Sequence, residues 1–175
     1  MLAGAILFAL GVTTATAADV YYQSFNIGLP TSPPGCNTGD YPGGAGTYPF
    51  PSDWLRFNVD NKTPAASVAY VNNAWIVRED FSFDVTQCVA FSTSWYSPAG
   101  QADDWMWSPA IAIPAGGGAL SWRAVTYDAS YRDGYEVRVK TGAAPDLSNQ
   151  TTSTVIHSTA AEQSTWTSYT EDLST

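Results

Sequence analysis

Positive charge is scarce in this sequence. Seven Lys and Arg stand against 16 Asp and Glu in 175 residues, which gives a formal net charge of −9, and the cations are scattered along the chain. Binding to nucleic-acid phosphates or to anionic membranes requires clustered cations. The composition therefore argues against both kinds of partner, whereas an acidic surface favours solubility and attracts cations such as calcium.

Residues that carry hydrolytic chemistry are almost missing. His157 is the single histidine, it lies in the strand-like stretch TVIHST, and no G-x-S-x-G nucleophile motif accompanies it. Asp103 and Asp104 are adjacent, so in an extended chain their side chains point in opposite directions, and nothing selects the second acid that a glycosidase needs. These absences predict a noncatalytic protein.

Cysteine is also rare, with only Cys36 and Cys88 in the chain. No nearby His or Cys completes a metal site around either residue. Disulfides form in exported proteins, so if this chain is exported its two cysteines favour one disulfide between Cys36 and Cys88.

Long apolar runs are missing except at the start of the chain. Residues 2–12 are apolar or small, no charge precedes Asp19, and Ala15-Thr16-Ala17 has the form of an A-x-A cleavage signal. The run is too short to span a bilayer. Although a basic n-region is missing, the pattern indicates a secretory leader over residues 1–18, followed by one domain over residues 19–175. We therefore expect a secreted or cell-surface protein with no transmembrane segment in the mature chain.

Aromatic residues and turn formers are abundant, with seven Trp, ten Tyr, 14 Gly and 11 Pro. Residues 135–142 alternate most clearly, with Tyr135, Val137 and Val139 on one face and charged side chains on the other. Because each strand has one apolar side to bury and no long amphipathic helix follows the leader, we predict an all-β sandwich. Extended segments are predicted at residues 19–28, 54–64, 68–73, 74–80, 87–96, 105–114, 119–128, 135–142, 153–159 and 165–174.

Acidic side chains recur in the loops between these segments. Calcium takes about six to eight oxygen ligands and is often bound in such loops, which makes it a candidate cofactor. Each carboxylate taken alone is better explained as the cap of a turn. The candidate calcium ligands are Asp60, Asp103, Asp104, Asp128 and Asp133.

Aromatic residues near the predicted loops suggest a surface that stacks against sugars, because Trp and Tyr faces pack on the apolar faces of carbohydrates. The candidate ligand-binding residues are Trp95, Tyr96, Tyr127 and Tyr131. Trp105, Trp107 and Trp122 fall in strand patterns instead, and we predict that they fill the core.

Short motifs recur in a fixed order between residues 90 and 142, and the segments 54–64 and 166–174 extend the pattern to both sides. In these motifs the chain resembles the cleaved-adhesin and choice-of-anchor J domains of bacterial surface proteins, which include the adhesin modules of the gingipain proteases. The matching positions are Ala90, Ser92, Ser94, Asp103, Asp104, Trp105, Ser108, Pro109, Leu120, Trp122, Tyr135, Glu136 and Val137.

This resemblance implies a galactose-binding-like β jelly roll that is noncatalytic and has loops that calcium stabilises in some members. It implies adhesion or recognition at the cell surface, with an extracellular protein or glycan as the ligand. The family continues with further strands after the Asp-Leu-Ser found here at residues 172–174. We therefore expect that the last strands are lacking, either because the chain is a fragment or because a neighbouring copy supplies a strand by self-assembly. Two other functions stay open, a carbohydrate-binding module attached to a hydrolase and a structural subunit of an extracellular assembly.

Overall fold

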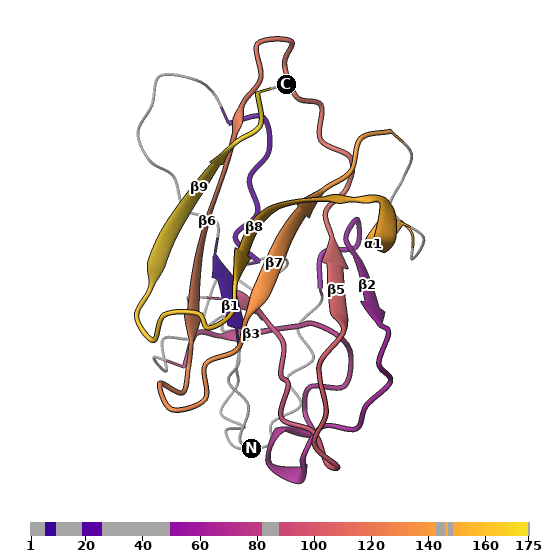
Figure 1. Cartoon of the computed structure of the whole chain (residues 1–175), viewed down its shortest axis with the longest axis vertical. Coiled ribbons are helices and arrows are strands. Elements are labelled where there is room, and N and C mark those ends of the chain that lie inside the picture. The colour runs from indigo at the N-terminus through magenta and orange to yellow at the C-terminus, as the bar shows by residue number, and fades with distance from the viewer. Residues whose placement is uncertain are drawn as a thin grey trace, which may run out of the picture.

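The computed structural model describes residues 6–9, 19–25, 50–81, 88–142, 146 and 149–174. Within these ranges the chain is mostly β, which confirms the predicted class, and its helical parts are a 3-10 turn, Ala66–Val68, and one short helix, α1 (Asn149–Thr152) (Figure 1). The strands are β1 (Ile6–Ala9), β2 (Leu55–Asn58), β3 (Ile76–Glu79), β4 (Cys88–Phe91), β5 (Asp104–Trp107), β6 (Ala119–Thr126), β7 (Tyr135–Val139), β8 (Thr154–Thr159) and β9 (Thr167–Asp172).

Two predicted strands are wrong. Residues 68–73 follow the 3-10 turn, where the amide of Val71 donates to the carbonyl of Val68, and they form no strand. Residues 19–25 also hold no strand. There the side chain of Gln23 accepts a hydrogen bond from the amide of Phe25 at 2.6 Å, and a local bond of this kind competes with strand pairing.

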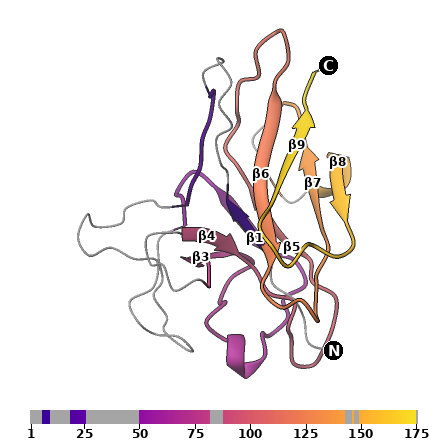
Figure 2. The ribbon, with the colours of Figure 1, turned by 90° about the vertical axis from the view of Figure 1, so that its left-hand side faces the viewer.

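The strands form three antiparallel sheets. One sheet has the order β3-β4-β1-β6-β9, and two separate pairs are β2-β5 and β7-β8. Figure 2 shows the β7-β8 pair on the side of β6 that is opposite to β3 and β4. Among the described residues no helix is long and apolar enough to cross a membrane.

β1 lies within residues 1–18, the predicted leader, and it fills a position between β4 and β6. It runs antiparallel to both, with Leu7 opposite Phe91 on one side and Val125 on the other. Because each neighbour is antiparallel to β1, β4 and β6 run in the same direction and are bridged by a single strand. Cleavage of the leader stays a prediction.

Buried clusters cover both faces of the five-stranded sheet. On one face, Ala90, Trp122 and Ala124 belong to a cluster against which Met106 of β5 and Val137 of β7 pack, so all three sheets share this core. On the other face, Val89, Phe91 and Val125 pack with Val71, Ile76 and Trp166. The alternation predicted around residues 87–96 is therefore real in β4, but both of its sides are apolar environments.

Cys88 begins β4 and is buried in the first of these clusters. No cysteine in the described ranges is a free thiol. Cys36 lies outside the described residues, so its pairing with Cys88 stays a prediction.

Candidate functional site

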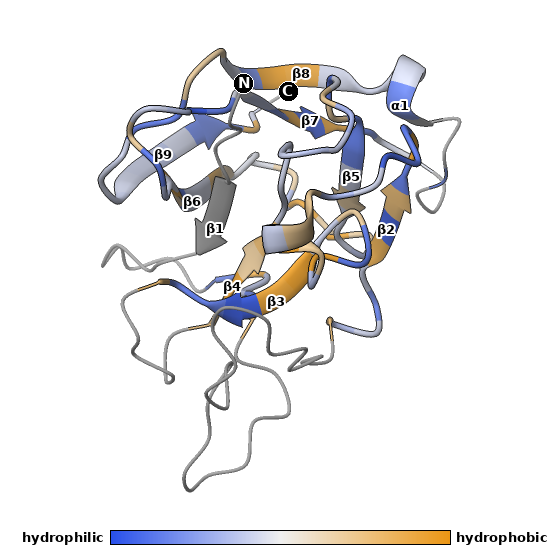
Figure 3. Ribbon diagram, turned by 90° about the horizontal axis from the view of Figure 1, so that it is seen from below, coloured by the Kyte–Doolittle hydropathy of each residue, from blue (hydrophilic) through white to orange (hydrophobic). Residues whose placement is uncertain are grey.

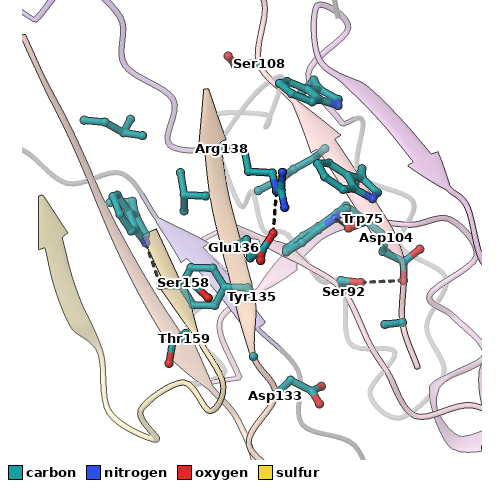
Figure 4. A pocket seen from close by; sticks show the side chains of 18 of the residues that line it. Trp75, Ser92, Asp104, Ser108, Asp133, Tyr135, Glu136, Arg138, Ser158 and Thr159 are labelled. Atoms are coloured by element: carbon teal, nitrogen blue, oxygen red, sulfur yellow. Dashed lines mark hydrogen bonds and ion pairs between the residues drawn. The ribbon is translucent and has the colours of Figure 1, made fainter. Parts of the chain in front are cut away.

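A groove of about 900 Å³ opens between the two small sheets, with β5 along one side and β7 along the other (Figure 4). Side chains from both faces of the two strands line the groove. Met106 of β5 and Val137 of β7 pack on the core, while their sequence neighbours point the other way. The apolar floor is extended by Trp54, Trp75 and Trp122.

Trp105 and Trp107 line the groove as a stacked pair, with ring centroids 6.0 Å apart and an interplanar angle of 13°. Both are half-buried and belong to neither core cluster, so the prediction that they fill the core is wrong, whereas it is confirmed for Trp122. The indole Nε1 of Trp105 donates to the carboxylate of Asp103 at 2.6 Å. The indole Nε1 of Trp107 is buried and has no acceptor in the described part of the chain.

β7 places an ion pair opposite these rings. The guanidinium of Arg138 donates to Glu136 at 2.6 Å and lies 5.7 Å from the ring centre of Trp105, so its side chain reaches from one strand pair to the other. Figure 4 shows Glu136 and Arg138 on the side of β7 that faces Trp75 and Asp104. Four acidic residues and one arginine line the groove, which gives it a net negative charge.

Asp104 is the most perturbed acid of the groove. Its Oδ2 accepts hydrogen bonds from the hydroxyls of Tyr96 at 2.7 Å and Ser92 at 3.3 Å, and its Oδ1 is buried without a partner in the described residues. Burial is the main cause that raises the pKa of Asp104 to about 6, and the hydrogen bond from Tyr96 opposes this rise.

This shift predicts a pH-dependent stability. The unfolded carboxyl has a pKa of 3.8, so between that value and about 6 the folded state holds the proton more tightly and the free energy of unfolding falls as the pH rises. Asp104→Asn is expected to remove this fall and to gain on the order of 1 kcal/mol over wild type at neutral pH, after discounting for solvent screening. Urea unfolding between pH about 4 and pH about 7.5 measures it. Parallel pH profiles for the two proteins would contradict the assignment.

The candidate calcium ligands are engaged in other ways. Asp60 accepts from the amides of Lys62 and Asp103, both at 2.7 Å, Asp128 caps the amide of Ser130, and Asp133 accepts from the hydroxyl of Ser94. Asp60, Asp103 and Asp104 come together, while Asp128 and Asp133 have their own separate contacts. No group of three or more His, Cys, Asp or Glu in the described ranges has the geometry to hold a metal. The described carboxylates thus form no calcium site by themselves, and calcium stays a prediction, which loss of thermal stability in EDTA would support.

The candidate ligand-binding aromatics do not line the groove. Tyr96 is buried and directs its hydroxyl to Asp104. Tyr127 is 55% exposed and stacks on Phe81 at 4.0 Å, while Trp95 and Tyr131 are half-buried. These four residues therefore do not form a common surface in the groove.

His157 lies in β8 inside an aromatic cluster rather than in the groove. Its ring contacts Trp122 at 5.0 Å and Tyr169 at 4.8 Å, and its Nδ1 is 3.0 Å from Glu171. Sequence reasoning missed Glu136 and Arg138 as site residues, because the charged face of residues 135–142 has the pattern of an ordinary solvent-exposed face. The one available signal was the Trp-x-Trp spacing at residues 105–107, which places two large rings on one side of a strand.

Comparison with protein-family models, with curated proteins and with solved structures finds no match for the chain. The resemblance to adhesin domains therefore remains a prediction from the motifs.

Proposed function

We propose that the protein is a noncatalytic recognition domain of an exported protein, acting in adhesion, and that the groove between β5 and β7 is its ligand-binding surface. The observation that carries the proposal is the half-buried pair Trp105 and Trp107, set opposite Arg138 and Glu136 and outside both core clusters. Large aromatic side chains that are kept out of the core and beside polar groups are typical of binding surfaces.

The proposed fold is a β jelly-roll sandwich. The five-stranded sheet is one layer, and the pairs β2-β5 and β7-β8 together make the other. Support comes from the shared cluster, in which side chains of β4 and β6 pack with Met106 and Val137 of the two pairs. In this arrangement the groove is an interruption of the second layer, which explains why apolar core residues line it.

The noncatalytic part of the proposal is supported by how the acids of the groove are bound. Glu136 is paired with Arg138, Asp104 accepts from two hydroxyls, and Asp133 accepts from Ser94. Each carboxylate is therefore held by donors of its own chain rather than directed with a second acid at a common point, as hydrolysis of a glycosidic bond requires. A hydrolytic activity that Asp104→Asn abolishes would contradict this.

Trp107→Ala is expected to weaken ligand binding at least tenfold, because half-buried Trp is among the strongest contributors to recognition. The measurement is binding to a glycan array and to a panel of extracellular-matrix proteins, compared with wild type. Tyr127→Ala is the matched control, since it removes an exposed aromatic residue away from the groove. If Tyr127→Ala loses binding and Trp107→Ala retains it, the ligand binds at the aromatic surface predicted from the sequence, which includes Tyr127, and not in the groove.

The carbohydrate-binding module is the second candidate function. Its support is the set of indole rings among polar side chains in a groove open to solvent. Binding confined to the glycan array would favour it over adhesion to proteins.

A further inference from the structure

We propose that the groove between β5 and β7 is a strand-acceptor site, which binds an extended segment of a partner protein antiparallel to both strands. The inference rests on the proposed function, since it names the class of ligand that this groove recognises. The partner segment is neutral or basic and alternates between apolar and polar residues.

No second described strand pairs with β5 or with β7 on the groove side. β5 pairs with β2 alone, and β7 pairs with β8 alone. Figure 4 shows that both strands run in the same direction, from Asp104 towards Ser108 and from Asp133 towards Arg138. A single strand inserted in the opposite direction therefore makes an antiparallel ladder with each, and this is how extended peptides add to sheets.

The five-stranded sheet contains the same arrangement of two strands that run in one direction, but there a third strand lies between them. There β4 and β6 run in one direction, and β1 lies between them, antiparallel to each. All other pairings of the described strands are antiparallel too. Because β5 and β7 run in one direction, a single strand added between them can be antiparallel to both.

The side chains of β5 and β7 determine which residues of the added strand are favoured. On the core side its neighbours are Met106 and Val137, which favour apolar residues. On the other side its neighbours are the rings of Trp105 and Trp107 and the Arg138–Glu136 pair. Four acids against one arginine disfavour an acidic segment, and a chain of net charge −9 is for the same reason a poor partner for itself.

Two further observations favour a polypeptide over a sugar. Trp105 stacks on Trp107 and also has the guanidinium of Arg138 over its ring, so groups of the chain already contact this indole, which disfavours its stacking on a pyranose. The buried Nε1 of Trp107 lacks an acceptor in the described residues, and a carbonyl of an inserted strand is a suitable one.

The test uses the full chain and a displayed library of alternating peptides of about six residues, the usual length of a strand. The best binders are resynthesised with alternate backbone nitrogens methylated, which removes one row of hydrogen-bond donors and keeps every side chain, and with Lys replaced by Glu. Cello- and chito-oligosaccharides form the glycan arm. Hydrogen exchange of the β5 and β7 amides reports whether the backbone is engaged.

The expected result is selection of neutral or basic peptides whose affinity falls at least tenfold on N-methylation and again on the change to Glu, and which slow amide exchange in both β5 and β7. Trp107→Ala lowers their affinity. Equal binding of the methylated peptides would overturn the strand assignment. Failure to select any peptide, with oligosaccharides that bind wild type and not Trp107→Ala, would also overturn it while leaving the proposed function standing. If the protein self-associates and a selected peptide blocks this association, the occupant of the groove is a second copy of the chain and the basic partner is wrong. If neither peptides nor oligosaccharides bind, both the strand-acceptor site and the proposed function are wrong.

Discussion

Replacing Trp122 by Ala is expected to lower the free energy of unfolding by about 3–5 kcal/mol, the range for large aromatic residues in packed cores. The side chain is 3% exposed in the cluster that the three sheets share. Its indole stacks on Tyr169 at 5.4 Å and meets His157 edge-on at 5.0 Å, and its Nε1 donates to the hydroxyl of Tyr135 at 3.0 Å. Truncation removes contacts with β7, β8 and β9 together and leaves a cavity that cannot collapse without moving strands.

Urea denaturation of wild type and variant gives the difference, provided that both transitions have the same slope. Trp107→Ala is the matched control, because it removes the same side chain from a half-buried position outside the core, and its expected cost is about 1 kcal/mol. Equal losses in the two variants would show that Trp107 belongs to the core, and the groove would then be a packing defect rather than a binding surface.

The elements that the sequence predicts best are those with a clean alternation. β7 begins at the predicted residue, Tyr135, because Val137 on one side packs on the shared core while the other side carries charged residues. β6 also begins where it was predicted, at Ala119, although buried residues lie on both of its faces, and Trp122 is in the core as predicted. Figure 3 shows the two colours alternating along β2, where the extended segment was also expected.

The site could not be predicted in the same way, because it depends on which strands meet. Nothing in residues 104–107 or 135–139 indicates that β5 and β7 flank one groove, since neither pairs with the other. Trp105 and Trp107 have the apolar character of core residues, yet both are half-buried and belong to neither core cluster. The raised pKa of Asp104 likewise arises from burial beside Tyr96, which lies across a loop in the chain.

Arg78 and Glu79 show a second limit of sequence reasoning. In Figure 3 the strand β3 changes from apolar to strongly polar along its length, which in a sequence has the appearance of an exposed strand end. Both residues are instead buried, with 6% and 1% of their surfaces exposed. The pair form a short ion pair, and Arg78 also donates to the hydroxyl of Tyr70 at 2.6 Å and packs its guanidinium 3.5 Å from the ring centre of Phe81.

Arg78→Met is therefore expected to cost about 3–5 kcal/mol of unfolding free energy, because it leaves a buried carboxylate without its cation. The methionine preserves much of the apolar contact with Phe81, so the loss reports mainly on the charge. Arg78→Met combined with Glu79→Met removes both charges and is expected to recover most of that loss, since an apolar pair has no desolvation cost to offset. A double-mutant cycle by urea unfolding gives the coupling energy. If the double variant is as unstable as Arg78→Met alone, the ion pair is not the source of the loss, and the stacking of Arg78 on Phe81 and its bond to Tyr70 must carry it instead.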